Sequence, residues 1–258
     1  MIFWFSGTGN SRYVAERLAS ELHDMSLAIM ATDVSSLKME GESLGFIFPV
    51  YSWGVPPQVV EFIDRLPASF LTEADKRGIW MVCTCGDETG MCPEMLEKKL
   101  KDRGVSLRGV WSVIMPNDYV LLPGFDVDSK AVEREKLSEA PERIRTIAKS
   151  ICDKEWQRDF TRGSWAKLKT SLIYPLFKRW GISYKKWRSE ARCIGCGKCA
   201  QVCPMKNIEM KSKRPLWGNN CASCCACFHI CPVNAVQYGK ATIKKHQYMF
   251  PGKSENKT

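Results

Sequence analysis

The sequence predicts an α/β protein: a doubly wound parallel sheet of five strands in residues 1–153, followed by a smaller α+β domain rich in cysteine. Three observations support this prediction. Short apolar runs alternate with helical patterns through the first part of the chain. A loop of glycines and hydroxyl side chains follows the first apolar run, and nine of the 13 cysteines lie between positions 193 and 231. A chain of 258 residues is long enough for one large and one small domain.

The elements of the first part alternate as a doubly wound sheet requires. Residues 1–5 are continuously apolar, which is typical of a parallel strand that is buried on both faces. Apolar side chains then recur at helical spacing, as at Tyr13, Val14 and Leu18. The expected strands are 1–5, 25–31, 44–50, 78–83 and 105–115, and the expected later helices are 57–66, 92–100 and 130–151.

The loop after the first strand is a candidate phosphate site. Its glycines let the backbone close around an anion, and its hydroxyls and the amides at the helix start can donate to that anion. It is not a G-x-G-x-x-G motif, because Arg12 stands where the third glycine would be, and it lacks the lysine of a P-loop. The alternative is an ordinary tight turn between strand and helix. The candidate contacts are Ser6, Thr8, Gly9, Asn10 and Ser11.

Two more loops are expected at the same edge of the sheet. After the third strand, aromatic residues stand beside glycine and proline, which makes a rigid loop that can stack a flat ring. The alternative is that the aromatic rings only cover the sheet edge. After the fourth strand, the backbone should again approach the ligand. The candidates in these two loops are Pro49, Tyr51, Trp53 and Gly54, and then Thr84, Cys85 and Gly86.

Three cysteines lie near this edge, outside the cysteine-rich segment. Cys83 and Cys85 alternate at the end of a strand, and Cys92 begins the next helix. They could form a redox-active dithiol, but buried cysteines that act as small hydrophobic residues are more common, and we favour that interpretation. Asn117, Asp118 and Tyr119 follow the fifth strand and are expected, from position alone, to rim the same pocket.

The cysteine-rich segment contains the spacing C-x2-C-x2-C-x3-C-P twice. In this spacing, three thiolates wrap one iron–sulfur cubane and the fourth, before proline, reaches the other cubane. Zinc would usually need only four ligands, and disulfides would imply a secreted chain, so two [4Fe–4S] clusters are expected. Cys225 falls outside the spacing and is expected not to be a ligand. The first set is Cys193, Cys196, Cys199 and Cys231, and the second is Cys203, Cys221, Cys224 and Cys227.

Residues 154–186 are predicted to be a basic, tryptophan-rich helical linker between residues 1–153 and the domain at 187–245, with 246–258 as a tail. Residues 1–153 carry a net charge of −6, and residues 154–258 carry +16. Apolar residues at Leu168, Leu172, Ile173 and Leu176 share one helical side of the linker. Such a helix could lie on a membrane surface, but we favour packing of this side on the first domain.

Together these motifs resemble the flavodoxin–ferredoxin fusion proteins of anaerobic bacteria. The resemblance implies a flavodoxin-like sheet with strand order 2-1-3-4-5 and a bacterial two-cluster ferredoxin domain. It also implies that the loop at 6–11 holds the phosphate of FMN and that Tyr51 or Trp53 stacks on the flavin. The aromatic residue that flavodoxins often carry after the fourth strand is missing here, so the second face of the ring is left open or is covered by something else.

The function implied by the resemblance is electron transfer between two [4Fe–4S] clusters and FMN, with other redox proteins as partners. The alternative is a flavin-dependent reductase of a small organic molecule. No nucleic-acid motif, signal peptide or long apolar segment is present in the sequence, so we expect a cytoplasmic protein without nucleic-acid partners.

Overall fold

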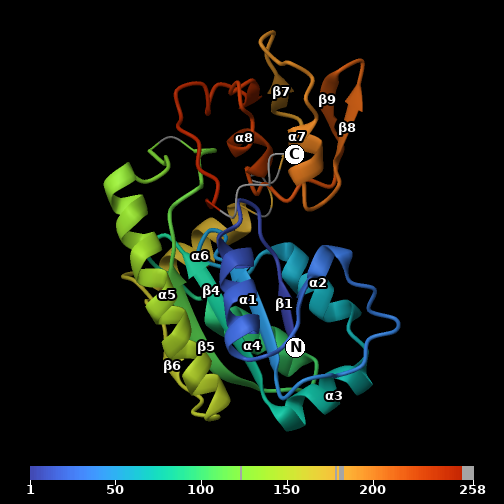
Figure 1. The fold of residues 1–258 in the computed structure, drawn as a ribbon, viewed down its shortest axis with the longest axis vertical. Coiled ribbons are helices and arrows are strands. Elements are labelled where there is room, and N and C mark those ends of the chain that lie inside the picture. The colour runs from blue at the N-terminus through green and yellow to red at the C-terminus, as the bar shows by residue number, and fades with distance from the viewer. Residues whose placement is uncertain (123, 178, 180–182, 252–258) are drawn as a thin grey trace.

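The computed structural model describes the chain except residues 123, 178, 180–182 and 252–258. Its larger unit is built on a six-stranded parallel sheet with the order β2-β1-β3-β4-β5-β6 (Figure 1). The predicted order 2-1-3-4-5 is confirmed, and one short edge strand is added to it. The strands are β1 (Ile2–Trp4), β2 (Ser26–Ala28), β3 (Leu44–Pro49), β4 (Ile79–Cys85), β5 (Leu107–Ile114) and β6 (Arg158–Asp159).

The added strand β6 comes from the beginning of the predicted linker. It pairs in parallel with β5, through Val110 with Arg158 and Trp111 with Asp159. Trp156 packs against the same core as the neighbouring strand. The sheet therefore extends past residue 153, the predicted end of the first domain. A two-residue strand is too short to give a periodic signal in the sequence.

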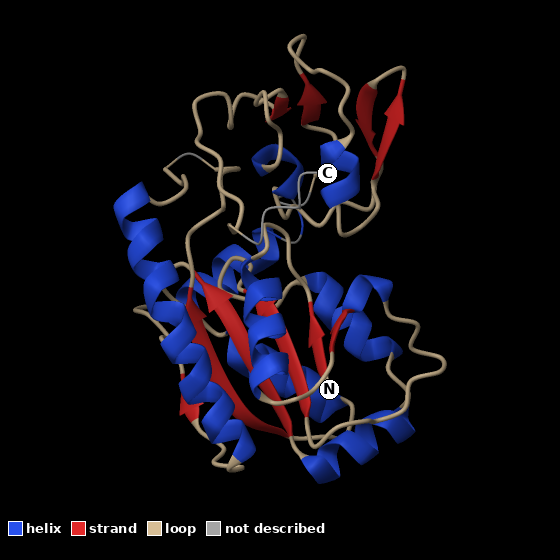
Figure 2. Cartoon of the chain, in the orientation of Figure 1, coloured by secondary structure: helices blue, strands red, loops and turns tan. Residues whose placement is uncertain are grey.

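Helices cover both faces of the sheet (Figure 2). Side chains that alternate along the strands reach two separate cores: Phe3 lies in one and Ile2 in the other. One core receives apolar residues of α2, α3 and α4, and the other receives those of α1 and α5. The helix α3 was not predicted. The helices are α1 (Asn10–Glu21), α2 (Pro57–Arg65), α3 (Ala68–Arg77), α4 (Cys92–Asp102) and α5 (Lys130–Cys152), with a 3₁₀ turn at Ile29–Ala31.

The smaller unit lies over the carboxyl ends of the parallel strands (Figures 1 and 2). It contains two antiparallel pairs, β7 with β10 and β8 with β9, and two short helices. Its core includes Val120 and Leu121, which follow β5 in the chain, so the larger unit contributes a loop to the smaller one. The elements are β7 (Trp187–Ser189), α7 (Lys198–Val202), β8 (Ile208–Lys211), β9 (Arg214–Trp217), α8 (Ala226–His229) and β10 (Val236–Tyr238).

The helix α6 (Ala166–Leu176) joins the two units and packs on the larger one. Its buried side chains are Ala166, Thr170 and Tyr174. The leucines expected to pack are about half exposed, with Leu172 at 58%. The expectation that the leucine side packs on the first domain is therefore wrong. None of the helices in the described part of the chain is long and apolar enough to cross a membrane.

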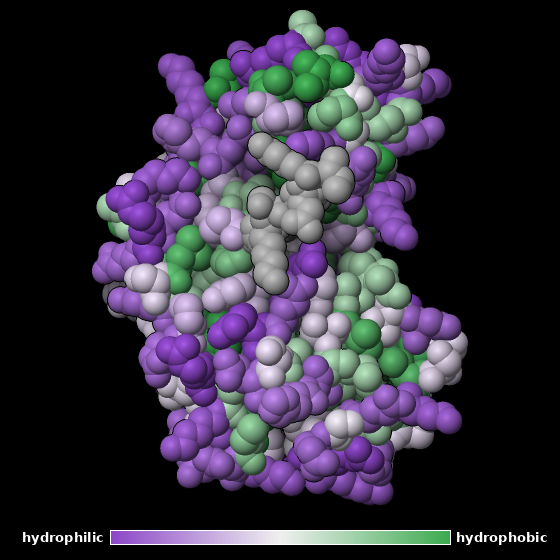
Figure 3. All heavy atoms as spheres, in the orientation of Figure 1, coloured by the Kyte–Doolittle hydropathy of each residue, from purple (hydrophilic) through white to green (hydrophobic). Residues whose placement is uncertain are grey.

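Polar side chains dominate the molecular face in Figure 3 over the helices of the larger unit. Apolar residues gather near the junction of the two units and at the far end of the smaller unit. The junction is also where the carboxyl ends of the strands meet the cysteine-rich unit.

Candidate functional site

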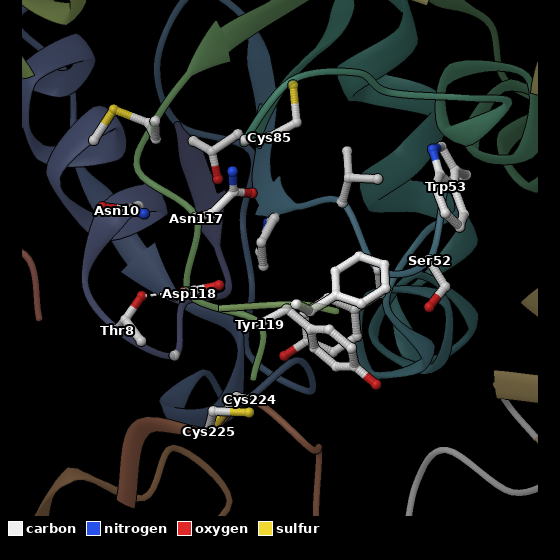
Figure 4. Close-up of a pocket in the computed structure, with 18 of the residues that line it drawn as sticks. Thr8, Asn10, Ser52, Trp53, Cys85, Asn117, Asp118, Tyr119, Cys224 and Cys225 are labelled. Atoms are coloured by element: carbon white, nitrogen blue, oxygen red, sulfur yellow. Dashed lines mark hydrogen bonds between the residues drawn. The ribbon is translucent and has the colours of Figure 1, made fainter. Parts of the chain in front are cut away.

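A cavity of about 470 Å³ lies at the carboxyl ends of the strands, between the two units. All three loops that the sequence analysis selected contribute to its wall. Figure 4 shows Thr8 and Asn10 at one side of the cavity, Trp53 at the other, and Cys224 and Cys225 at the end that faces the smaller unit. Of the predicted residues, the cavity is lined by Ser6, Thr8, Asn10, Ser11, Pro49, Tyr51, Trp53, Thr84, Cys85 and Gly86. Gly9 and Gly54 belong to these loops but do not line it.

The first loop has the form of an anion site. It ends at the first residue of α1, a twelve-residue helix, so the positive end of that helix and its first amides lie at the cavity. Gly9 adopts φ +107°, and its N–H donates to Ser6 Oγ at 3.2 Å, which closes the loop. The Ser11 and Thr84 hydroxyls lie 2.7 Å apart and tie the loop to β4. Arg12 is exposed and pairs with Glu16 rather than with the loop.

Asp118 gives this site a feature that sequence spacing could not predict. The Thr8 hydroxyl donates to its carboxyl group, and the carboxyl group lies in the cavity wall (Figure 4). Burial raises the pKa of Asp118 to about 6, and the hydrogen bond from Thr8 offsets only part of that effect. Asn117 and Tyr119 also line the cavity, as their position after β5 suggested.

The loop after β3 is held in place by α6. The Thr170 hydroxyl donates to the Trp53 carbonyl at 3.0 Å, and the Tyr174 hydroxyl donates to the Val55 carbonyl at 2.5 Å. Lys169 lies 5.4 Å from the centre of the Trp53 ring, and the Trp53 indole N–H donates to Glu88 at 2.5 Å. These contacts fix a loop in which Trp53 has the positive φ of 63°. The aromatic wall is therefore rigid before any ligand enters.

Tyr51 is the clearest sign that the cavity is built for a polar ligand. Its ring contacts Phe177 edge-on, with the ring centres 5.9 Å apart. Its hydroxyl is buried and has no hydrogen-bond partner among the described residues. Burial raises the pKa of Tyr51 well above its ordinary value, so this hydroxyl is a neutral donor. A buried hydroxyl without a partner costs free energy, which a ligand acceptor in the cavity would recover.

Two cysteines of the first unit behave as buried small hydrophobic residues, the interpretation favoured from the sequence. Cys83 and Cys92 are fully buried in the core beneath the cavity, and only Cys85 lines the cavity. The pKa of Cys83 is raised, first by its hydrogen bond with Cys92 and then by burial. Burial also raises the pKa of Cys85. Cys83 and Cys85 are therefore thiols rather than reactive thiolates at neutral pH.

The two predicted cysteine sets occupy different places in the smaller unit. A separate hollow is lined by all four members of the first set, together with Gly197 and Pro232. No three His, Cys, Asp or Glu side chains in the described ranges converge on a point where a single metal ion could be held. The members of the first set are Cys193, Cys196, Cys199 and Cys231.

The members of the second set lie close to one another; Cys227 is buried, and Cys203, Cys221 and Cys224 are partly buried. Burial, followed by the charges of Cys203 and Cys221, raises the pKa of Cys224 to about 12. The pKa of Cys227 is raised in the same way, by burial and then by Cys224 and other members of the set. Backbone N–H groups donate to two of the sulfurs, from Asn207 to Cys203 and from Ser223 to Cys221, each at 3.4 Å. Such N–H···S bonds are suited to thiolate ligands of a cluster.

This second set adjoins the main cavity. Ser223, Cys224 and Cys225 line the cavity wall opposite the sheet. Gly7 in the first loop lies so close to Cys224 that a Cβ on it would be 2.7 Å from the Cys224 Cβ, so only glycine fits there. Cys225 is buried, and its thiol donates to the Ser223 carbonyl at 3.6 Å. The two candidate cofactor sites therefore share a wall.

Residues 182–239 match the family model described as a 4Fe-4S dicluster domain. No sequence among the curated proteins matches the chain. Because the sheet has the flavodoxin order, the chain joins a flavodoxin-like fold to a 4Fe–4S dicluster domain.

The chain is also similar to solved structures, through its larger unit. Rubredoxin oxygen:oxidoreductase from Desulfovibrio gigas is 14% identical, with a TM-score of 0.39; the match covers 60% of this chain and 36% of that one. Oxidised flavodoxin 1 from Bacillus cereus is 16% identical, with a TM-score of 0.37 and coverage of 59% and 95%. The Fusobacterium nucleatum flavodoxin bound to flavin mononucleotide is 14% identical, with a TM-score of 0.38 and coverage of 60% and 97%.

Proposed function

We propose that this protein transfers electrons between two [4Fe–4S] clusters in its smaller unit and an FMN in the main cavity, with other redox proteins as donor and acceptor. When bound, a cubane passes one electron at a time and a flavin accepts two, so the combination couples one-electron to two-electron chemistry. The two cysteine sets would hold the clusters. The loops at the carboxyl ends of β1, β3 and β4 would hold FMN.

The observation that supports this proposal most is the shared wall. Cys224 lines the same cavity as Thr8, Tyr51 and Gly86, which come from three loops of the sheet. A carrier whose two cofactors acted separately would not need this contact. Gly7 against Cys224 brings the loop that would hold the FMN phosphate and the second cysteine set into van der Waals contact.

The donors in the cavity fit a flavin with a terminal phosphate. The amides at the start of α1 and the hydroxyls of Ser6 and Ser11 suit a phosphate without the help of a cationic side chain. The rigid aromatic wall at Tyr51 and Trp53 suits a flat ring, and the unpartnered Tyr51 hydroxyl suits a polar group on that ligand.

The first cysteine set is the place where a redox partner would dock. Cys196 is exposed, and Ile194 beside it is 62% exposed. The residues from 154 to 258 carry the net charge of +16, which favours a partner with an acidic surface. Cys224 of the second set lines the cavity, so the first set would exchange electrons with the partner and the second set with the flavin.

A second candidate is the flavin-dependent reductase of a small organic molecule. One observation favours it: beyond the predicted flavin loops, the cavity wall continues along Leu122, Phe125, Ile173 and Phe177. Three of these side chains are more than a third exposed at the cavity mouth. An apolar mouth of this kind suits a small apolar substrate as well as a partner protein.

Anaerobic purification tests the proposal. The protein should contain about eight irons with matching acid-labile sulfide, and one flavin that chromatographs as FMN rather than FAD. A preparation that cannot be loaded with FMN, or that holds iron for one cluster only, would refute it. Rapid oxidation of the reduced protein by apolar acceptors such as quinones, and not by redox proteins, would favour the reductase instead.

A further inference from the structure

The segment Gln247–Phe250, here called the strap, connects the smaller unit with the first loop of the sheet. Its beginning is anchored beside the cluster ligands. The Gln247 side-chain amide donates to the Cys231 carbonyl at 2.9 Å, and the Tyr248 N–H donates to His229 Nδ1 at 3.1 Å. His229 in turn donates from Nε2 to the Asp118 carbonyl at 2.7 Å, which fixes its neutral tautomer.

The end of the strap lies against the loop that would hold the FMN phosphate. The Phe250 N–H donates to the Thr8 carbonyl at 2.9 Å. The Phe250 ring stacks on Tyr13 in α1, with the ring centres 4.3 Å apart and the planes inclined by 24°. A Cβ on Gly9 would be 2.9 Å from the Phe250 Cβ, so the strap touches the loop at its left-handed residue.

Tyr248 acts on Asn10, which lines the cavity. Its buried hydroxyl donates to Asn10 Oδ1 at 2.6 Å, and Asn10 Nδ2 donates to the Pro116 carbonyl at 3.0 Å. The oxygen of the amide is thus occupied from one side and one of its two N–H groups from the other. This fixes the rotamer of Asn10 and the direction of its remaining N–H.

We infer that Tyr248 and Phe250 are positioning residues for the FMN phosphate. They act through Asn10 and through the Thr8–Gly9 backbone, which they hold in the conformation that presents donors to the anion. Neither residue lines the cavity. An anion site made of amides and hydroxyls depends on preorganisation, because each donor that must be ordered on binding lowers the affinity. This inference rests on the proposed function, since it requires FMN in the main cavity.

Two substitutions in the full chain test the Tyr248 hydroxyl and the Phe250 ring separately. Tyr248→Phe removes only the hydroxyl and should weaken FMN binding about tenfold, the effect of losing one buried hydrogen bond at such a site. Phe250→Ala removes the stacked ring and should speed FMN release by about tenfold or more. Phe250→Tyr keeps the ring and should restore slow release. The matched controls are Tyr238→Phe and Phe160→Ala, because neither residue lies in the first loop or lines the cavity.

The experiment measures the Kd and release rate of FMN by flavin fluorescence, and the ³¹P NMR shift of the bound phosphate. A positioning role predicts weaker binding and a displaced ³¹P signal in Tyr248→Phe, with iron content unchanged and with both controls like the wild type. Wild-type binding, release and ³¹P shift in both strap variants would overturn the inference while leaving the proposed function intact. A wild-type protein that binds no FMN would overturn the proposed function, and the strap's role with it.

Discussion

Asp118 is the residue that most changes the chemistry of the cavity. A carboxyl group beside a loop that binds phosphate is unusual, because an ionised carboxylate repels the negatively charged phosphate. Burial raises the pKa of Asp118 to about 6, so the carboxyl group is neutral below that pH and ionised above it. The raised pKa also means that Asp118 stabilises the fold at low pH and that this contribution is lost as the pH rises through 6.

The pH dependence of FMN binding should therefore depend on this residue. Asp118→Asn and the wild type should bind FMN about equally at pH 5. At pH 8 the variant should bind about tenfold more tightly, because the wild-type carboxylate then repels the phosphate. The second ionisation of the phosphate itself falls near pH 6 and occurs with both proteins, but the added charge is repelled by a carboxylate only in the wild type, so it changes the ratio of their Kd values in the same direction.

Titration of FMN binding from pH 5 to 8 in both proteins checks this, with the exposed Asp153→Asn as the control. A Kd ratio that stays constant across the range would mean that Asp118 does not face the phosphate.

Cys225 and Cys196 test the ligand assignment at the residue scale. Cys225→Ser should retain about eight irons, because this thiol bonds to the Ser223 carbonyl and lies outside the cluster spacing. Cys196→Ser should fall below eight irons, with the loss confined to one cluster. Iron and acid-labile sulfide assays on anaerobic protein measure both. Equal iron loss in the two variants would contradict the assignment.

At the scale of elements, α6 packs on the larger unit as predicted for the linker. It packs with the side that holds Thr170 and Tyr174, and not with the predicted leucine side. Its leucines share one side and Ala166, Thr170 and Tyr174 share another, so spacing alone could not tell which side packs. The side with Thr170 and Tyr174 packs because their hydroxyls donate hydrogen bonds to carbonyls of the loop after β3. The leucine side is left in solvent, and Trp165 at its start is 76% exposed.

This arrangement predicts opposite sensitivities on the two sides of α6. Tyr174→Phe should lower the free energy of unfolding by about 1 kcal/mol, because it leaves the Val55 carbonyl without its donor. Leu172→Ser on the exposed side should change it by less than about 0.5 kcal/mol. Denaturant unfolding of the two variants measures this. A larger loss in Leu172→Ser would show that the leucine side packs after all.

Local and tertiary features of the fold differ in how far they could be predicted. The phosphate loop and the cysteine spacing were predictable, because each places its chemistry within about a dozen consecutive residues. The strand order was implied by the resemblance to flavodoxins, and the sheet has that order. Asp118 and Tyr248 could not be assigned roles, because their partners Thr8 and Asn10 are 110 and 238 residues away in the chain.

For the whole molecule, the two units are interlocked rather than tethered. The loop after β5 enters the core of the smaller unit, the strap returns to the first loop of the sheet, and α6 binds the loop after β3. The opposite net charges of residues 1–153 and 154–258 favour the same arrangement. Interlocking of this kind keeps the second cysteine set at the cavity wall without help from a partner.

The central claim is that electrons pass between the clusters and the flavin within one molecule. Flash photoreduction of the clusters in the anaerobic, FMN-loaded protein, followed by the absorbance change of the flavin, tests it most directly. Transfer within one molecule predicts a first-order rate that stays the same when the protein concentration is changed tenfold. A rate proportional to protein concentration would show that electrons pass only between molecules and would contradict transfer within one molecule.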